Sequence, residues 1–70
     1  MELWTVYDRP RDFPQHCAVR KVLVEEDGLE PADWHLFRSL QEARATLARR
    51  GLIPVPRGVR DDPALVETWL

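Results

Sequence analysis

The sequence predicts an α+β fold, namely a small, mostly antiparallel sheet of three to four strands with one helix, at about residues 40–50, packed on it. Two runs rich in β-branched and aromatic residues, Leu3–Tyr7 and Cys17–Glu25, are typical of strands. A later segment beginning at Ser39 carries the marks of a helix start and stop. The 70 residues form a single small domain, 1–70, near the lower size limit for one hydrophobic core.

Side-chain alternation supports the first two strands. In the run from residue 3 to residue 7, Trp4 and Val6 share one face and the remaining residues share the other. Apolar groups on both faces favour a central position in the sheet. Alternation from Cys17 to Glu25 is imperfect, but no helical period fits this run better. The acidic segment Glu26–Pro31 contains Gly and Pro and is predicted to be a turn or loop.

The helix has the clearest local signals. It follows Trp34–Arg38, which is predicted to form a short third strand. Ser39 and Glu42 have the spacing of a capping box, in which the serine oxygen accepts from the Glu42 N–H and the carboxylate returns to the serine N–H. Apolar residues then repeat at helical spacing: Leu40, Ala43, Leu47 and Ala48. Gly51 stands where a left-handed residue ends a helix.

Prolines shape the remainder of the chain. Leu52–Arg57 contains two of them, so it must be extended and can form an edge strand or a covering strap but not a central strand. Valine, threonine and tryptophan in Ala64–Leu70 favour a last strand. A short helix with Asp62 as its cap and Pro63 in its first turn is the alternative for this segment.

Three tryptophans are many for a chain of this length, and each large aromatic buries substantial area. Trp4 and Trp69 both stand in short apolar runs of strand character. We therefore expect both side chains to lie in the core or at its rim and to join the two ends of the chain.

The net charge and the cysteine content limit which kinds of partner and which cellular compartment the sequence favours. The formal net charge is −2, which removes the global electrostatic argument for nucleic acid or an anionic membrane. Cys17 is the single cysteine, so no internal disulfide forms, and this fits a reducing compartment. The first residues do not resemble a signal peptide, and no apolar run approaches a membrane span. The expected location is the cytoplasm.

No set of residues indicates catalysis, and the chain is expected not to be an enzyme. The only serine is Ser39, which the helix cap explains. His16 and Cys17 are neighbours on a predicted strand and should point to opposite faces, so they are a poor metal pair, and no second cysteine completes a zinc set. Asp61 and Asp62 are explained by a turn or cap before the following proline. We expect no catalytic residue, no metal and no cofactor, with Cys17 structural or idle.

Arginine is the residue type in visible excess, and it favours bidentate recognition of carboxylate or phosphate. One candidate group lies near the end of the helix and would form a local basic patch: Arg49, Arg50, Arg57 and Arg60. The alternative is a solvated face, which the negative net charge favours over a nucleic-acid site.

The second candidate site is the segment between the first two strands. Asp8–Gln15 is longer than a tight hairpin needs, and its two prolines are expected to hold Arg9 and Phe13 extended, which makes it stiff. Phe13 with Arg9 and Arg11 is a combination that protein interfaces favour. In the alternative, Phe13 caps one end of the core, while Asp8 and Asp12 hold the turn and pair with the arginines.

Three motifs carry a resemblance that spans nearly the whole chain: Trp4–Asp8 with Pro10, Asp12 and Pro14; Ser39–Arg44; and Asp61–Trp69. With them the sequence resembles a group of short uncharacterised bacterial proteins, to which no known activity is attached. The resemblance implies a small bacterial domain and transfers no catalytic or binding residue.

The resemblance and the absence of a catalytic set together predict a non-enzymatic protein-interaction or accessory module of a bacterial cytoplasmic system. Its expected partner is another protein, and it is not expected to bind a membrane. A small nucleic-acid-associated regulator that uses the arginines near the helix C-terminus is the alternative. A third possibility is an accessory subunit that contributes residues to an enzyme active site in a complex.

Overall fold

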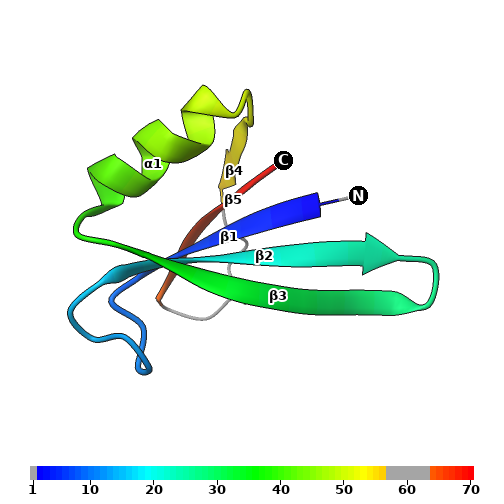
Figure 1. Ribbon diagram of the computed structural model, residues 1–70, viewed down its shortest axis with the longest axis horizontal. Helices are drawn as coiled ribbons and strands as arrows, with labels where there is room; N and C mark the ends of the chain where they lie inside the picture. The colour runs from blue at the N-terminus through cyan, green and yellow to red at the C-terminus, as the bar shows by residue number, and fades with distance from the viewer. Residues whose placement is uncertain (1, 57–63) are drawn as a thin grey trace.

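The computed structural model describes residues 2–56 and 64–70, and it is a five-stranded sheet with one helix on one of its faces (Figure 1). Its elements are β1 (Glu2–Asp8), β2 (Cys17–Glu25), β3 (Gly28–Phe37), α1 (Leu40–Arg49), β4 (Pro54–Pro56) and β5 (Leu65–Trp69). The strand order is β3-β2-β1-β5-β4, and every neighbouring pair is antiparallel. The predicted α+β class is confirmed, but the sheet has five strands rather than three to four.

Strand β3 is much longer than the sequence suggested. It begins at Gly28, so most of the predicted loop Glu26–Pro31 is strand and only residues 26–27 form the turn. Gly28 has φ +142°, a conformation that glycine adopts readily and that lets the strand start directly after the turn. Pro31 is tolerated because β3 is an edge strand, and it pairs with Val22 beside a bulge in the β2–β3 register.

Strand β4 is the other addition to the predicted sheet, and it lies at the opposite edge. Ile53 and Leu70 exchange both backbone hydrogen bonds, each 3.0 Å. Because hydrogen-bonding direction alternates along a strand, Val55 also faces β5, and the nitrogens of Pro54 and Pro56 face the free edge. Neither proline therefore removes a ladder bond, and the prediction of an extended edge is confirmed.

Strand β1 is central, as predicted, and β5 runs beside it as a strand rather than the alternative short helix. Trp4 lies opposite Trp69 in the β1–β5 register, and both side chains are only 5% exposed. The prediction that Trp4 and Trp69 both lie in the core and so join the first and last strands is therefore confirmed. Asp62 and Pro63, the proposed start of the alternative helix, lie outside the described residues.

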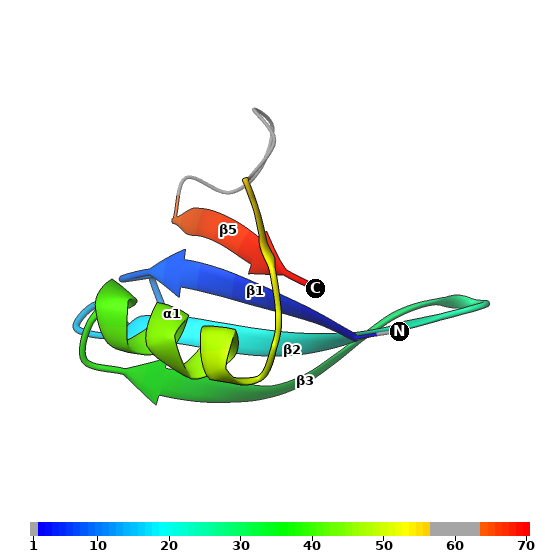
Figure 2. The ribbon, with the colours of Figure 1, turned by 90° about the horizontal axis from the view of Figure 1, so that it is seen from above.

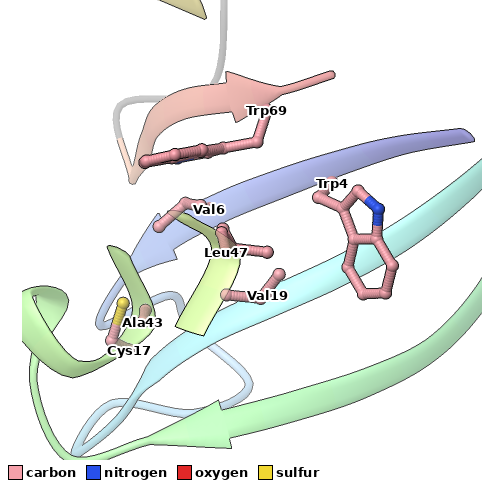
Figure 3. Close-up of a cluster of buried hydrophobic side chains, with 7 residues drawn as sticks. All are labelled: Trp4, Val6, Cys17, Val19, Ala43, Leu47 and Trp69. Atoms are coloured by element: carbon pink, nitrogen blue, oxygen red, sulfur yellow. The ribbon is translucent and has the colours of Figure 1, made fainter. Parts of the chain in front are cut away.

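The core lies between α1 and the helix side of the sheet (Figure 2). Its buried side chains come from both the sheet and the helix and are drawn in Figure 3: Trp4, Val6, Cys17, Val19, Ala43, Leu47 and Trp69. Residues in α1 repeat at the spacing that turns one stripe toward the sheet, which is why Ala43 and Leu47 are its buried positions. The helix thus covers one face of the sheet, and no other helix of residues 2–56 and 64–70 covers the opposite face.

The helix ends where the sequence signals place them. Ser39 has an extended backbone, and its Oγ accepts a hydrogen bond from the Glu42 N–H at 3.1 Å. At the other end, Gly51 has φ +80° and its N–H donates to the Ala48 carbonyl oxygen at 3.0 Å. The cap and the left-handed glycine supply partners for backbone groups that the helix itself leaves free.

Replacing Ser39 by alanine is expected to lower the free energy of unfolding by about 1 kcal/mol, because the Glu42 N–H loses its acceptor. Chemical denaturation followed by far-UV circular dichroism measures this change. Ser39→Asp keeps an acceptor oxygen and should retain most of the stability. An equal loss in the alanine and aspartate variants would contradict the capping role.

Candidate functional site: the open face of the sheet

The face of the sheet opposite α1 is the most distinctive surface of the molecule, and we call it the open face. The strand registers assign its residues, because side chains directly opposite each other share a face. Its members are Leu3, Thr5, Tyr7, Ala18, Arg20, Val22, Val24, Leu29, Pro31, Trp34, Leu36, Val55, Leu65 and Thr68. The set crosses all five strands.

The open face is apolar and uncovered. Among the described residues no helix or strand packs on it, and Ala18 is its only buried member. Leu36 is 44% exposed and Val55 is 42% exposed, although both are large apolar side chains. Arg20 carries the only charge in the set. A contiguous exposed apolar surface of this kind commonly marks a site of interaction with another macromolecule.

Aromatic rings cluster at one end of the open face. The Trp34 ring lies between two others, with its centroid 5.3 Å from that of Tyr7 and 5.5 Å from that of Phe13. The Arg20 guanidinium carbon lies 4.9 Å from the Trp34 ring centroid. Rings at these distances and angles attract each other edge to face, and the cation is attracted to the ring. Four side chains, three from β1, β2 and β3 and one from the 9–16 loop, therefore form one cluster.

Phe13 reaches this cluster because of the path of the loop between β1 and β2. The loop drops below the sheet, on the side away from α1 (Figure 1). Two turns shape it, with the Phe13 N–H donating to the Pro10 carbonyl oxygen and the His16 N–H donating to the Phe13 carbonyl oxygen. Phe13 consequently packs against Trp34 on the open face and is not among the side chains that pack on the helix-side core cluster.

The loop arginines behave differently from the prediction. Arg9 is not extended, because its φ is +51°, in the left-handed region. Its N–H still donates to the His16 carbonyl oxygen, so the chain turns away directly after its last pairing with β2. Arg9 and Arg11 are exposed, and within the described residues neither forms an ion pair with Asp8 or Asp12.

The predicted basic patch near the end of α1 is separate from the open face. Arg49 donates from Nη2 to Thr46 Oγ1 at 3.3 Å, on its own helix. The Arg50 guanidinium carbon lies 4.8 Å from the centroid of the Trp4 ring and so covers the edge of the core. Arg57 and Arg60 lie outside the described residues. The structure therefore does not bring Arg49 or Arg50 together with Phe13.

Sequence reasoning did not predict an ion pair on the helix side in which the carboxylate is buried and the guanidinium is half exposed. Glu67 is 7% exposed, and its Oε1 accepts from Arg44 Nε at 3.0 Å and Nη2 at 2.6 Å. Its Oε2 accepts from Trp69 Nε1. The hydrogen bond to Glu67 raises the pKa of Arg44 above its ordinary value. The one available signal was a glutamate on the same strand face as Trp69.

Cys17 is held as an unreactive thiol. It is buried beside α1, and burial raises the pKa of the thiol, with a further rise from the Asp8 carboxylate and an opposing effect from Arg44. Its neighbour His16 is exposed, as expected. Because the protonated thiol is a poor nucleophile, the structural role is supported over the catalytic one.

The raised pKa of Cys17 makes stability fall in alkaline solution. Above the ordinary thiol value near 9.0, the unfolded chain loses the proton while the folded chain keeps it, so unfolding becomes more favourable as pH rises. The wild type should lose stability relative to Cys17→Ala by up to about 1.4 kcal/mol per pH unit in this range. Denaturation of both proteins between pH 7 and 10 measures it, because every other group is common to the two chains. Parallel curves would contradict the prediction.

Other kinds of site are not visible in the described part of the chain. No three His, Cys, Asp or Glu side chains within residues 2–56 and 64–70 gather where they could hold a metal ion. None of the helices in those ranges is both long and apolar enough to cross a membrane.

Comparison with known proteins adds no assignment. No protein-family model, no curated protein and no solved structure matches the chain. The geometry of the open face is therefore the basis for assigning a role.

Proposed function

We propose that the protein is a non-enzymatic protein-interaction module of the bacterial cytoplasm that binds its partner with the open face. The observation that carries this is the apolar character of the face on all five strands, with one charged side chain and no covering layer among the described residues. Removing apolar area from water is the main favourable term in association. The aromatic cluster of Tyr7, Phe13 and Trp34 supplies the residue types that dominate interface energetics.

The face is a better binding surface than the edges of the sheet. On β4, Pro54 and Pro56 turn their nitrogens to the free side, so that edge lacks two donors for a further strand. On β3, Pro31 and the adjacent bulge interrupt the other edge. Addition of a partner strand is therefore unfavourable at both edges, and the apolar face remains.

Affinity purification from the native lysate, followed by mass spectrometry, tests this proposal when it compares matched variants. Val55→Lys places a charge on the open face without removing a buried side chain. Gln41→Lys introduces the same residue on the exposed surface of α1 and serves as the control. A partner that is retained by the wild type and the control but lost by Val55→Lys is expected. A strictly monomeric protein without a partner, or a partner retained by all three, would contradict the proposal.

The loop is tested with a second pair of variants. Phe13→Ala should weaken partner binding, because Phe13 belongs to the open-face cluster, whereas Arg9→Ala combined with Arg11→Ala should leave both binding and stability unchanged. Thermal unfolding of each variant separates a loss of binding from a loss of folding. If the arginine pair abolishes binding while Phe13→Ala has no effect, the site lies on the loop and not on the open face.

The alternative of a nucleic-acid-associated regulator makes a different prediction. It requires binding to DNA or RNA that weakens steeply with salt and is lost in Arg49→Ala combined with Arg50→Ala. The described contacts of these two arginines, to Thr46 and to the Trp4 ring, lie on their own helix and at the core. Absence of binding at low salt would remove this alternative.

A further inference from the structure

Arg20 is the one charged group on the open face, and its position is unusual. It lies on β2 with Thr5 opposite it on β1 and Trp34 opposite it on β3, so apolar strands extend on both sides. Its Nε is buried, and no described group accepts a hydrogen bond from it. Stacking over the Trp34 ring holds the guanidinium in place but satisfies none of its N–H donors.

No strand residue that the structure describes offers Arg20 a carboxylate partner on this face. Six acidic residues lie on the strands, and their registers place five on the helix side: Glu2, Asp8, Glu25, Glu30 and Glu67. The sixth, Asp33, lies in the β3 bulge, where the register gives it no partner on β2, and no described ion pair joins it to Arg20. Glu2 and Glu67 are moreover already paired, with Lys21 and with Arg44.

We propose that the open face binds a segment of another protein in which apolar side chains surround one carboxylate, and that this carboxylate pairs with Arg20. The inference rests on the function proposed above and adds the chemistry of the partner. A partner that covers the face removes water from Arg20, and an unpaired buried charge opposes binding strongly. An aspartate or glutamate that meets the arginine fork through two parallel hydrogen bonds removes that penalty and fixes the register of the bound segment.

The same argument disfavours a second copy of this chain as the occupant. Two copies packed with their open faces together bring two Arg20 side chains into the interface, while the strand positions of those faces supply no carboxylate to either. Like charges in a desolvated interface raise the free energy of association. The described surface is therefore complementary to an acidic apolar segment and not to itself.

Two contacts hold Arg20 ready for such a ligand. Thr5 Oγ1 donates to the Arg20 carbonyl oxygen at 3.0 Å, which fixes the backbone of β2 at this point. The Arg20 guanidinium carbon lies 4.9 Å from the Trp34 ring centroid, and Trp34 in turn packs against Tyr7. An arginine that is already ordered loses little rotamer freedom on binding, so the pairing with a carboxylate is specific.

A displayed library of random twelve-residue peptides, selected against the intact chain, tests the proposal. We expect the enriched peptides to share one Asp or Glu among apolar positions. Binding of such a peptide should fall at least about thirtyfold for Arg20→Met, and Arg20→Lys should recover only part of it because the fork is lost. Changing the peptide carboxylate to its amide should cause a similar loss in the wild type and little further loss in Arg20→Met. Arg11→Met, on the exposed loop, is the matched control and should bind as the wild type does.

The outcomes separate this inference from the proposed function. Peptides that lack an acid, bind Arg20→Met normally and are lost by Val55→Lys overturn the carboxylate pairing while the open face remains a binding site. If Val55→Lys still binds the selected peptides, or if no peptide is enriched, both the carboxylate pairing and the open-face binding site are overturned. A concentration-dependent dimer in sedimentation that Val55→Lys abolishes assigns the face to a second copy and overturns the inference. Circular dichroism of Arg20→Met confirms that the variant is folded before binding is compared.

Discussion

Replacing Trp69 by alanine is expected to lower the free energy of unfolding by about 3–5 kcal/mol, the usual cost of removing a buried large aromatic side chain. The residue is almost fully buried, faces Trp4 across the β1–β5 register and donates from Nε1 to Glu67. The core of a 70-residue domain rarely provides more than about 3–5 kcal/mol in total, so most of the variant should be unfolded at room temperature. Urea denaturation followed by far-UV circular dichroism measures the loss.

The neighbouring residue provides the control. Leu70 is 45% exposed, and its links to Ile53 are backbone hydrogen bonds that survive substitution, so Leu70→Ala should change stability much less. Deleting both residues should be at least as severe as Trp69→Ala, since it also removes the pairing with Ile53. Unchanged unfolding of the truncated chain would show that the two tryptophans do not join the ends of the sheet.

Replacing Glu67 by alanine is the second change with a large expected effect, a loss of about 2–3 kcal/mol of unfolding free energy. The substitution leaves the buried Trp69 Nε1–H without its acceptor and releases the Arg44 guanidinium, which links α1 to β5. Arg44 is half exposed and can turn to water, so most of the cost arises at the buried indole. Chemical denaturation of the variant measures it.

Glu30→Ala is the matched control, because Glu30 is an exposed strand glutamate for which only a small change is expected. A double-mutant cycle with Arg44→Ala then isolates the contribution of the pair. If Glu67→Ala and Glu30→Ala are equally stable, the buried carboxylate contributes nothing to the link between helix and sheet.

Local signals predicted the parts of the fold that local interactions determine. The helix cap at Ser39 and the helix stop at Gly51 depend only on nearby backbone groups, and both are confirmed. The segment 26–31 was misread because Gly and Pro signal a turn in isolation, whereas pairing with the long strand β2 extends β3 through Pro31. Propensity is overridden where a neighbouring strand offers a continuous ladder.

The candidate site was harder to predict, for two physical reasons. Alternation placed Arg20 on one face of β2, but nothing in the sequence states which face the helix covers, and that choice decides whether Arg20 is in the core or on the open face. Likewise, the partner of Glu67 is Arg44, and no local pattern joins residues so far apart in the chain. Of the predicted binding residues that the structure describes, Phe13 lies on the open face and Arg49 and Arg50 do not.

The place of β5 between β1 and β4 has a consequence for the folding rate. The pairing of Trp4 with Trp69 joins segments near the two ends of the 70-residue chain, so a long loop must close before the central ladder forms. High contact order of this kind places folding in the range of milliseconds to seconds rather than microseconds. During synthesis, β1 to β3 and α1 leave the ribosome before β5 does. Until β5 arrives, the inner edge of β1 lacks its neighbour, and this nascent sheet is the state most open to pairing with other chains.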